Sequence, residues 1–137
     1  MRENGEKHMT DAEILTLVDK LERCLLSSGE FRHQDHLAVA AAYLYASGLE
    51  AALDKLRATL LRFSSHHGAS DKYHETLTRF WLEQVEKRLD RSVCLCESVR
   101  RVQAKLGDKN IVNQFYSAGR LNSLEAKARW VEPDLMQ

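Results

Sequence analysis

The chain has 137 residues, of which 44% are hydrophobic and 29% charged, so it is long enough and apolar enough to bury a core. One proline and six glycines are too few for the many turns of an all-β fold, and the composition excludes a disordered chain. Twenty basic and twenty acidic side chains balance, so no overall field draws the protein to nucleic acid or to a membrane, and we expect neither as a partner.

The N-terminal segment and the cysteines predict the cellular compartment. Residues 1–7 are polar, which predicts no signal peptide, and no apolar stretch reaches the roughly 20 residues of a membrane span. The cysteines are three, an odd number, so without a secretion signal we expect reduced thiols in a cytoplasmic protein. Residues 1–137 are predicted to form one domain, in which residues 1–9 are disordered.

The first predicted helix has a clear start signal. Thr10 and Glu13 have the spacing of a capping box, in which each side chain accepts a hydrogen bond from the backbone N–H of the other residue. The serine-rich segment 27–29 should end this helix. Between these limits four apolar residues recur at helical spacing and predict the buried face: Ile14, Val18, Leu21 and Leu25.

An alanine-rich and a leucine-rich segment predict the next two helices. The second helix is predicted at about 34–47, because its alanines favour helix, and Gly48 should be its C-terminal stop. The third helix is predicted at about 50–64, where leucines recur on one face, and a polar loop should follow at 65–70.

Caps and stop signals predict the remaining helices. Asp71 should cap a fourth helix that reaches about Leu89, and Ser92 should cap a fifth helix that ends at Gly107. Two short helices are predicted in the tail, at 110–116 and 123–130. The expected fold is all-α, a compact bundle of about five main helices with a short-helix C-terminal wrap.

Histidines at the starts of two central helices are the least ordinary feature of the chain. His36 shares a helix face with small and semi-polar residues, which suits the lining of a pocket: Ala40, Tyr43 and Ser47. His74 should also point inward, in line with Thr78, Trp81 and Val85. In the first turn of a helix the dipole favours the neutral imidazole, which is the form that accepts a proton or binds a metal.

The first functional hypothesis is a small-molecule site, catalytic or ligand-binding, in the interior of the bundle. His36 and His74 would act as general base or as ligands, and Glu75 as a second base or ligand. The hydrogen-bonding walls of this site would come from four further side chains: Tyr43, Thr78, Tyr116 and Arg120.

The same histidines admit a metal version of the site. His33 and His36 could share a divalent transition metal across one helix turn, with His74 and Glu75 supplied by the facing helix. Thr78 occupies the position at which a zinc-protease helix has its second histidine, so that motif is incomplete.

The second hypothesis is a non-catalytic protein-interaction module, in which the histidines are structural caps. The fourth and fifth helices carry basic residues that could contact a partner or form a solvated face: Arg88, Arg91, Arg100, Arg101 and Lys105. Cys94 and Cys96 are too closely spaced for the usual paired zinc ligands, and Cys24 alone cannot complete a site. A homodimer is compatible with the sequence.

Three segments, in this order along the chain, resemble a family of small uncharacterised bacterial all-helical proteins. They are Phe31-x-His33-x-Asp35-His36-Leu37, Tyr73-His74-Glu75-Thr76-Leu77-Thr78 and Val131-Glu132-Pro133-Asp134-Leu135. The resemblance spans residues 31 to 135, and the block at 73–76 is its most specific part. It implies a bacterial, cytosolic, helical protein, and it implies no activity.

Overall fold

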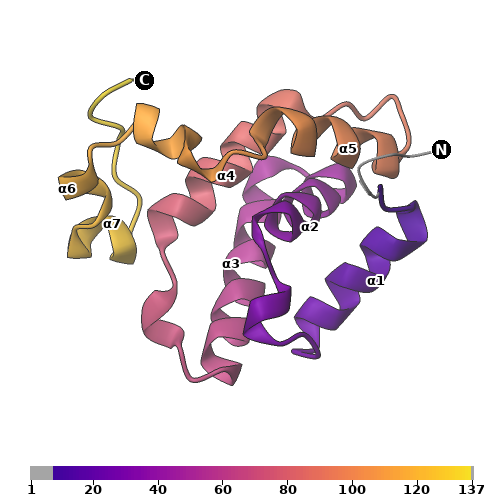
Figure 1. Cartoon of the computed structure of the whole chain (residues 1–137), viewed down its shortest axis with the longest axis horizontal. Helices are drawn as coiled ribbons and strands as arrows, with labels where there is room; N and C mark the ends of the chain where they lie inside the picture. Colours follow the sequence, from indigo (N-terminus) through magenta and orange to yellow (C-terminus); the bar gives the residue numbers. More distant parts are fainter. Residues whose placement is uncertain (1–7, 137) are drawn as a thin grey trace.

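The computed structural model describes residues 8–136, which are all-helical and contain no strand. Five main helices and two short ones follow one another (Figure 1): α1 Asp11–Glu22, α2 His33–Ala46, α3 Leu49–His66, α4 Glu75–Arg88, α5 Leu95–Leu106, α6 Ala118–Leu121 and α7 Leu124–Ala128. Three 3₁₀ helices lie between them: η2 Ser28–Glu30, η3 Ser70–Lys72 and η4 Lys109–Gln114. The predicted all-α bundle with a short-helix C-terminal wrap is confirmed. Disorder is predicted for residues 1–9, of which residues 1–7 lie outside the described residues.

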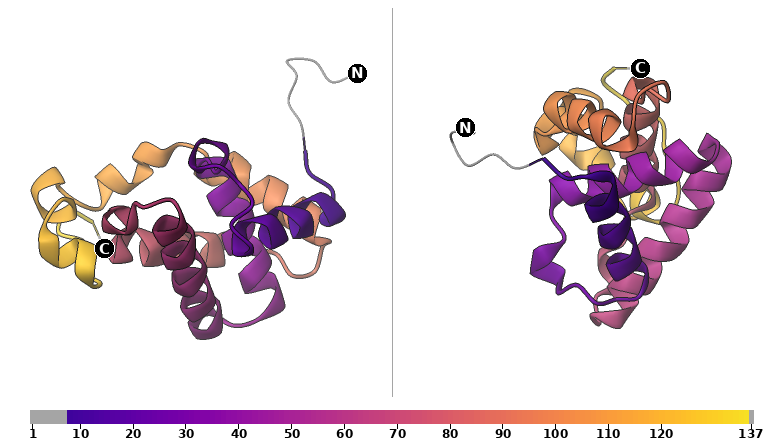
Figure 2. Two further views of the ribbon diagram at one scale, coloured as in Figure 1. Left: turned by 90° about the horizontal axis from the view of Figure 1, so that it is seen from below. Right: turned by 90° about the vertical axis from the view of Figure 1, so that its right-hand side faces the viewer.

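The helix α2 is central and contacts α1, α3, α4 and α5. Its residues from Leu37 to Leu44 are all buried, so it has no polar face over these two turns. Four of these eight residues are alanines, whose small side chains let the neighbouring helices approach closely. Figures 1 and 2 show α1 at one end of the molecule and α6 and α7 at the opposite end. In the part of the chain that the structure describes, no helix has the length and apolar character needed to cross a membrane.

The end of α1 differs from the prediction. The helix ends at Glu22, before the segment 27–29, because Cys24 adopts a left-handed conformation with φ 57°. The Leu25 N–H then donates to the carbonyl of Lys20 at 2.8 Å, which reverses the chain. Leu25 is consequently 59% exposed, and its predicted place on the buried face is wrong.

One predicted start signal is confirmed, and one predicted stop signal has a different role. The capping box of α1 is confirmed, with 2.9 Å from Thr10 N to Glu13 Oε1 and 3.1 Å from Glu13 N to Thr10 Oγ1. Gly48 is not the stop of α2, as predicted, but the N-cap of α3, and its φ of −86° needs no glycine. The helix α3 extends to His66, two residues beyond its predicted end at about 64, so the first two residues of the predicted loop are helical.

The caps of α4 and α5 were assigned to the wrong residues. Asp71 lies within η3, and the chain stays extended until His74, which is the N-cap of α4. Ser92 lies in the turn before α5, and the N-cap is Cys94. In both cases a residue type with weaker capping preference occupies the cap, because tertiary contacts and not local preference fix where the helix begins.

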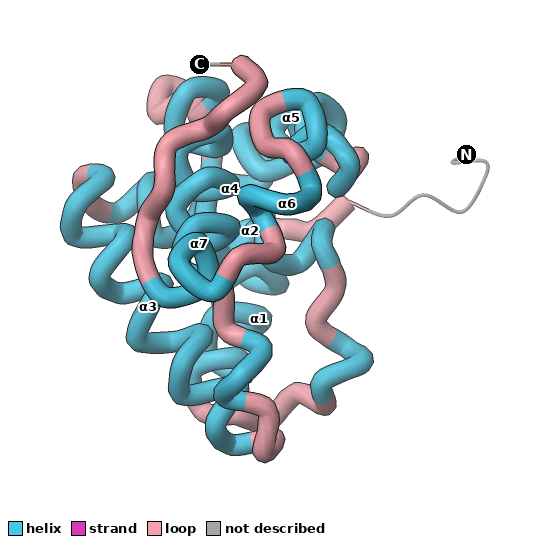
Figure 3. Tube along the Cα trace, turned by 90° about the vertical axis from the view of Figure 1, so that its left-hand side faces the viewer, coloured by secondary structure: helices cyan, strands magenta, loops and turns pink. Residues whose placement is uncertain are grey.

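The C-terminal segments form a second, smaller core against α4. The predicted helix at 110–116 is the 3₁₀ helix η4, and the predicted helix at 123–130 is the shorter α7. After α7 the chain runs as an extended segment along the outside of this end of the molecule (Figure 3). The small core contains five buried residues: Phe80, Val112, Tyr116, Ala126 and Val131. Because η4 bridges from α5 to this wrap, it closes one side of the space described next.

Candidate functional site

A cavity of about 1080 Å³, called here the central cavity, opens between α2, α3, α4 and η4. Its apolar wall includes large side chains from α3, from α4 and from the segment just before α2: Leu56, Leu60, Phe63, Leu77, Trp81 and Phe31. Three histidines and a threonine add polar groups to the wall: His33, His36, His74 and Thr78. Ligand pockets commonly measure about 300–1,000 Å³, so this space is large enough for a small organic molecule.

His36 is the cavity histidine with free ring nitrogens. It lies one turn into α2, and its ring stacks on Phe31 with 3.9 Å between centroids. No described residue forms a hydrogen bond with either of its nitrogens, and the side chain is exposed to the space in the cavity. Enclosure by protein atoms and the nearby His33 lower the pKa of His36 to about 4. At neutral pH the ring is therefore neutral, with one N–H donor and one acceptor available to a ligand.

His33 uses one ring nitrogen to hold two helices together. It is the first residue of α2, and its Nε2 donates to the carbonyl of Leu106 at the end of α5, at 2.9 Å. The same ring meets Trp81 edge-on, with 4.7 Å between centroids. His33 thus shapes the wall of the central cavity while one of its nitrogens is committed to the backbone.

His74 is committed at both ring nitrogens. Its Nδ1 accepts the N–H of Leu77 at 3.1 Å, which is the N-cap bond of α4. An acceptor Nδ1 requires the proton to lie on Nε2, which donates to the carbonyl of Leu121 at 2.8 Å. The neutral ring therefore ties α4 to α6, and no lone pair remains for a metal or for proton abstraction. This is the capping role that the sequence left open.

Glu75 faces away from the central cavity. Its carboxylate forms a bidentate pair with the Arg57 guanidinium of α3, at 2.7 Å from Nη2 to Oε2 and 3.0 Å from Nε to Oε1. The Tyr73 hydroxyl donates to the same carboxylate at 2.7 Å. The hydrogen bonds from Arg57, together with that from Tyr73 and the Arg57 charge, hold the pKa of Glu75 below its usual range. Glu75 therefore acts as an ion-pair partner between α3 and α4.

Three other predicted wall residues lie outside the lining of the central cavity, and each anchors a different part of the fold. The Tyr43 hydroxyl donates to Glu22 at 2.6 Å, beside α1. The Tyr116 hydroxyl donates to the carbonyl of Val131 at 2.6 Å, within the small core. Arg120 Nε donates to the carbonyl of Glu132 at 2.6 Å. Of the four predicted walls, Thr78 alone lines the cavity, and its hydroxyl donates to the carbonyl of His74 at 2.8 Å.

Comparison of the chain with protein-family models, with curated proteins and with solved structures gives no match. The chemistry of the molecule must therefore be inferred from its own geometry.

The predicted metal ligands are not gathered around one point. Among the residues that the structure describes, His33, His36, His74 and Glu75 do not place three ligand atoms within 4.8 Å of one another. The group that does so is Asp11, Cys94 and Cys96, which lie outside the lining of the central cavity. No local sequence pattern indicates this group, because its carboxylate comes from the start of α1, 85 positions before Cys96.

Three of the five basic residues predicted as a possible partner-binding face form ion pairs within the domain. Arg101 contacts Glu97 at 2.8 Å and Asp90 at 3.0 Å, and Arg91 donates to the carbonyl of Leu44 at 2.7 Å. Arg100 pairs with Glu97 as well. These three charges are therefore engaged within the domain.

A basic rim around the central cavity was missed by the sequence analysis. Arg32, Lys72 and Lys109 line the cavity and are exposed, whereas Asp108 is the acidic residue of the same lining. No described carboxylate pairs with any of these three cations. They come from three separated segments, so no local pattern in the sequence could have indicated that they share one rim.

Proposed function

We propose that the protein binds a small organic molecule with an apolar body and an anionic group in the central cavity. The observation that carries the proposal is the contrast among the three cavity histidines. His33 and His74 are bonded to backbone carbonyls, whereas both nitrogens of His36 are free of described partners. A polar group that the fold does not use, placed in an apolar wall, is suited to orient a ligand.

The wall and the rim favour different parts of the same ligand. Aromatic and aliphatic side chains such as Phe31 and Trp81 gain from covering an apolar body. The rim carries three cations against one acidic residue, so it favours an anionic group on that body. His36 is neutral at pH 7 and supplies one donated and one accepted hydrogen bond.

Binding is favoured over acid–base catalysis by the state of His74. Both ring nitrogens of His74 form hydrogen bonds with the backbone, one at the start of α4 and one to α6. Of the two histidines predicted as general bases, His36 alone has ring nitrogens available to a ligand. Glu75 pairs with Arg57 outside the cavity lining, so no described carboxylate orients His36 as it would in a catalytic pair.

Two dyes with the same apolar body test the proposal. Anilinonaphthalene sulfonate carries an anionic group, and N-phenylnaphthylamine lacks it. In a Trp130→Phe background the remaining tryptophan is Trp81, which lines the cavity, so energy transfer from it reports dye in the cavity. We expect saturable binding of both dyes, with the sulfonate bound about tenfold more tightly, because three exposed rim charges that each contribute about 0.5 kcal/mol together supply the roughly 1.4 kcal/mol of a tenfold difference.

Two variants and their controls locate the binding groups. His36→Ala should weaken sulfonate binding by about 2- to 10-fold, the value of one hydrogen bond, while exposed His66→Ala should not. Lys72→Glu combined with Lys109→Glu should remove the preference for the sulfonate, while exposed Lys87→Glu should not. Absence of energy transfer from Trp81, or equal affinity for the two dyes, would contradict the proposal.

A further inference from the structure

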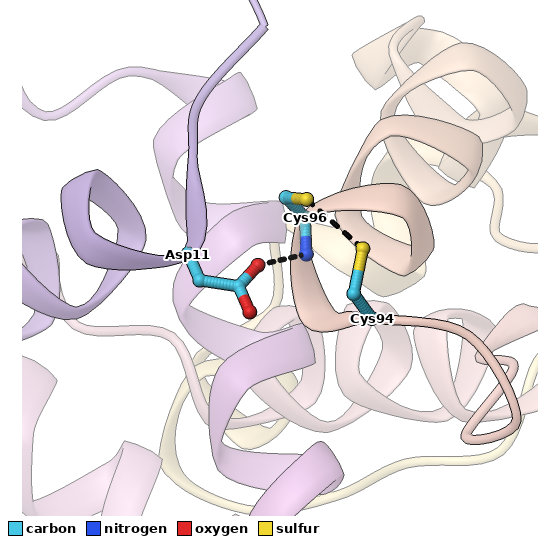
Figure 4. Close-up of side chains that lie close together, drawn as sticks. All are labelled: Asp11, Cys94 and Cys96. Carbon is cyan, nitrogen blue, oxygen red and sulfur yellow. Dashed lines mark hydrogen bonds between the residues drawn. The ribbon is translucent and has the colours of Figure 1, made fainter.

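Two thiols and a carboxylate meet where the starts of α1 and α5 come together (Figure 4). The Sγ atoms of Cys94 and Cys96 are 3.0 Å apart, and Asp11 Oδ1 accepts the backbone N–H of Cys96 at 2.7 Å. One ligand atom from each of the three residues lies within 4.8 Å of the others. Asp11 and Cys96 are 85 positions apart in the sequence, so the tertiary fold creates this group.

Local structure holds each member of the group in place. Asp11 is the first residue of α1, directly after Thr10, whose capping box fixes the start of that helix. Cys94 is the N-cap of α5, and its Sγ accepts the N–H of Glu97 at 3.4 Å. Leu95, between the two cysteines, is 7% exposed and packs in the main core. The backbone that carries both thiols is therefore anchored, although the Cys94 side chain is exposed and the Cys96 side chain is only half-buried.

We propose that Cys94, Cys96 and Asp11 form a binding site for a thiophilic divalent cation of the zinc class, with water as the fourth ligand. Two sulfur donors and one oxygen donor suit a soft or borderline cation, and zinc accepts both at tetrahedral angles. Three protein ligands with an open position are typical of zinc sites that keep a water molecule. The site lies outside the lining of the central cavity, so this proposal is independent of the proposed function.

Only a small adjustment separates the present geometry from a bound state. Zinc–sulfur bonds of about 2.3 Å at a tetrahedral angle place the two sulfur atoms about 3.8 Å apart. The sulfur atoms are now 3.0 Å apart, and rotation of the exposed Cys94 side chain can supply the difference. Binding must displace a proton from each thiol, so the apparent affinity should rise with pH. Asp11 would bind the ion through its second carboxylate oxygen, while Oδ1 keeps its bond to Cys96 N.

The test uses the full, untagged, reduced chain and two metal probes. Co²⁺ bound by two thiolates should give intense sulfur-to-metal charge-transfer absorption in the near ultraviolet, and added Zn²⁺ should abolish it by displacement. Zn²⁺ should also protect Cys94 and Cys96 from alkylation. Cys24, whose Sγ contacts the Arg62 carbonyl of α3, should remain reactive and serve as an internal reference.

Matched variants separate this site from adventitious binding. Cys94→Ser and Cys96→Ser should each abolish the charge-transfer band, and Cys24→Ser should leave it unchanged. Asp11→Asn retains the acceptor for the Cys96 N–H, so it should fold normally yet bind Zn²⁺ at least about tenfold more weakly, the smallest cost seen even for outer-shell partners. The proposal is overturned if the band is absent, if it survives either cysteine variant, or if the chain exposed to Zn²⁺ carries a disulfide between Cys94 and Cys96 in place of the ion.

Discussion

Replacing His74 by alanine should destabilise the fold by about 2 kcal/mol without the ring taking part in any chemistry. The substitution removes the N-cap acceptor of α4, which is typically worth about 1 kcal/mol, and the bond from Nε2 to the Leu121 carbonyl, which contributes about as much. His74→Asn should recover the first contribution, because asparagine is a strong N-cap residue, and should lose only about 1 kcal/mol.

Urea unfolding followed by far-ultraviolet circular dichroism measures both variants. With a slope of about 1–3 kcal/mol per molar urea, the midpoint of the His74→Ala variant should fall by about 1 M, and that of His74→Asn by about half as much. His66→Ala is the matched control, since that exposed ring has no described hydrogen bond, and its stability should change by less than about 0.5 kcal/mol. If His74→Ala behaved like this control, or if asparagine were no better than alanine, the capping role would be refuted.

Two further predictions concern other polar groups. Because the unfolded chain protonates His36 near pH 6.5 and the folded chain only near pH 4, the free energy of unfolding should fall as the pH is lowered through this window. Between pH 6.5 and pH 4 the free energy of unfolding of the wild-type protein should fall by about 1 kcal/mol more than that of a His36→Gln variant, which has no group that titrates at this position. This value is reduced because solvent reaches the ring, and urea unfolding at both pH values measures it. Tyr116→Phe should cost about 1–2 kcal/mol, because the Val131 carbonyl loses its partner in the small core; unchanged thermal stability would contradict this.

The helices themselves could be predicted because their signals are local. The capping box of Thr10 and Glu13 and the alanines of α2 act within one or two turns, and the corresponding elements form as expected. The start of α4 could not be predicted in this way. Asp71 is the better cap by local preference, but the bond of His74 to Leu121, 47 positions away, holds the histidine at the cap.

The placement of Glu75 depends on its tertiary partner. The residues of α4 and the segment before it that line the central cavity include adjacent pairs four positions apart: Tyr73 and His74, Leu77 and Thr78, and Trp81 and Leu82. Adjacent residues can therefore line this cavity together, and helical spacing alone does not exclude Glu75. The Glu75 carboxylate lies outside the lining because it pairs with Arg57 on α3, a contact that no local pattern indicates.

The opposite error set the cysteines aside. Judged by spacing alone, Cys94 and Cys96 were two donors short of a metal site, and no local pattern points from them to Asp11. The third donor, Asp11, reaches the cysteines because α1 and α5 both pack on α2 and contact each other. The buried apolar residues of these helices, and not the donors, determine this packing. Local spacing can therefore exclude only a site whose donors all come from one segment. It cannot exclude a site that the packing of distant helix ends assembles.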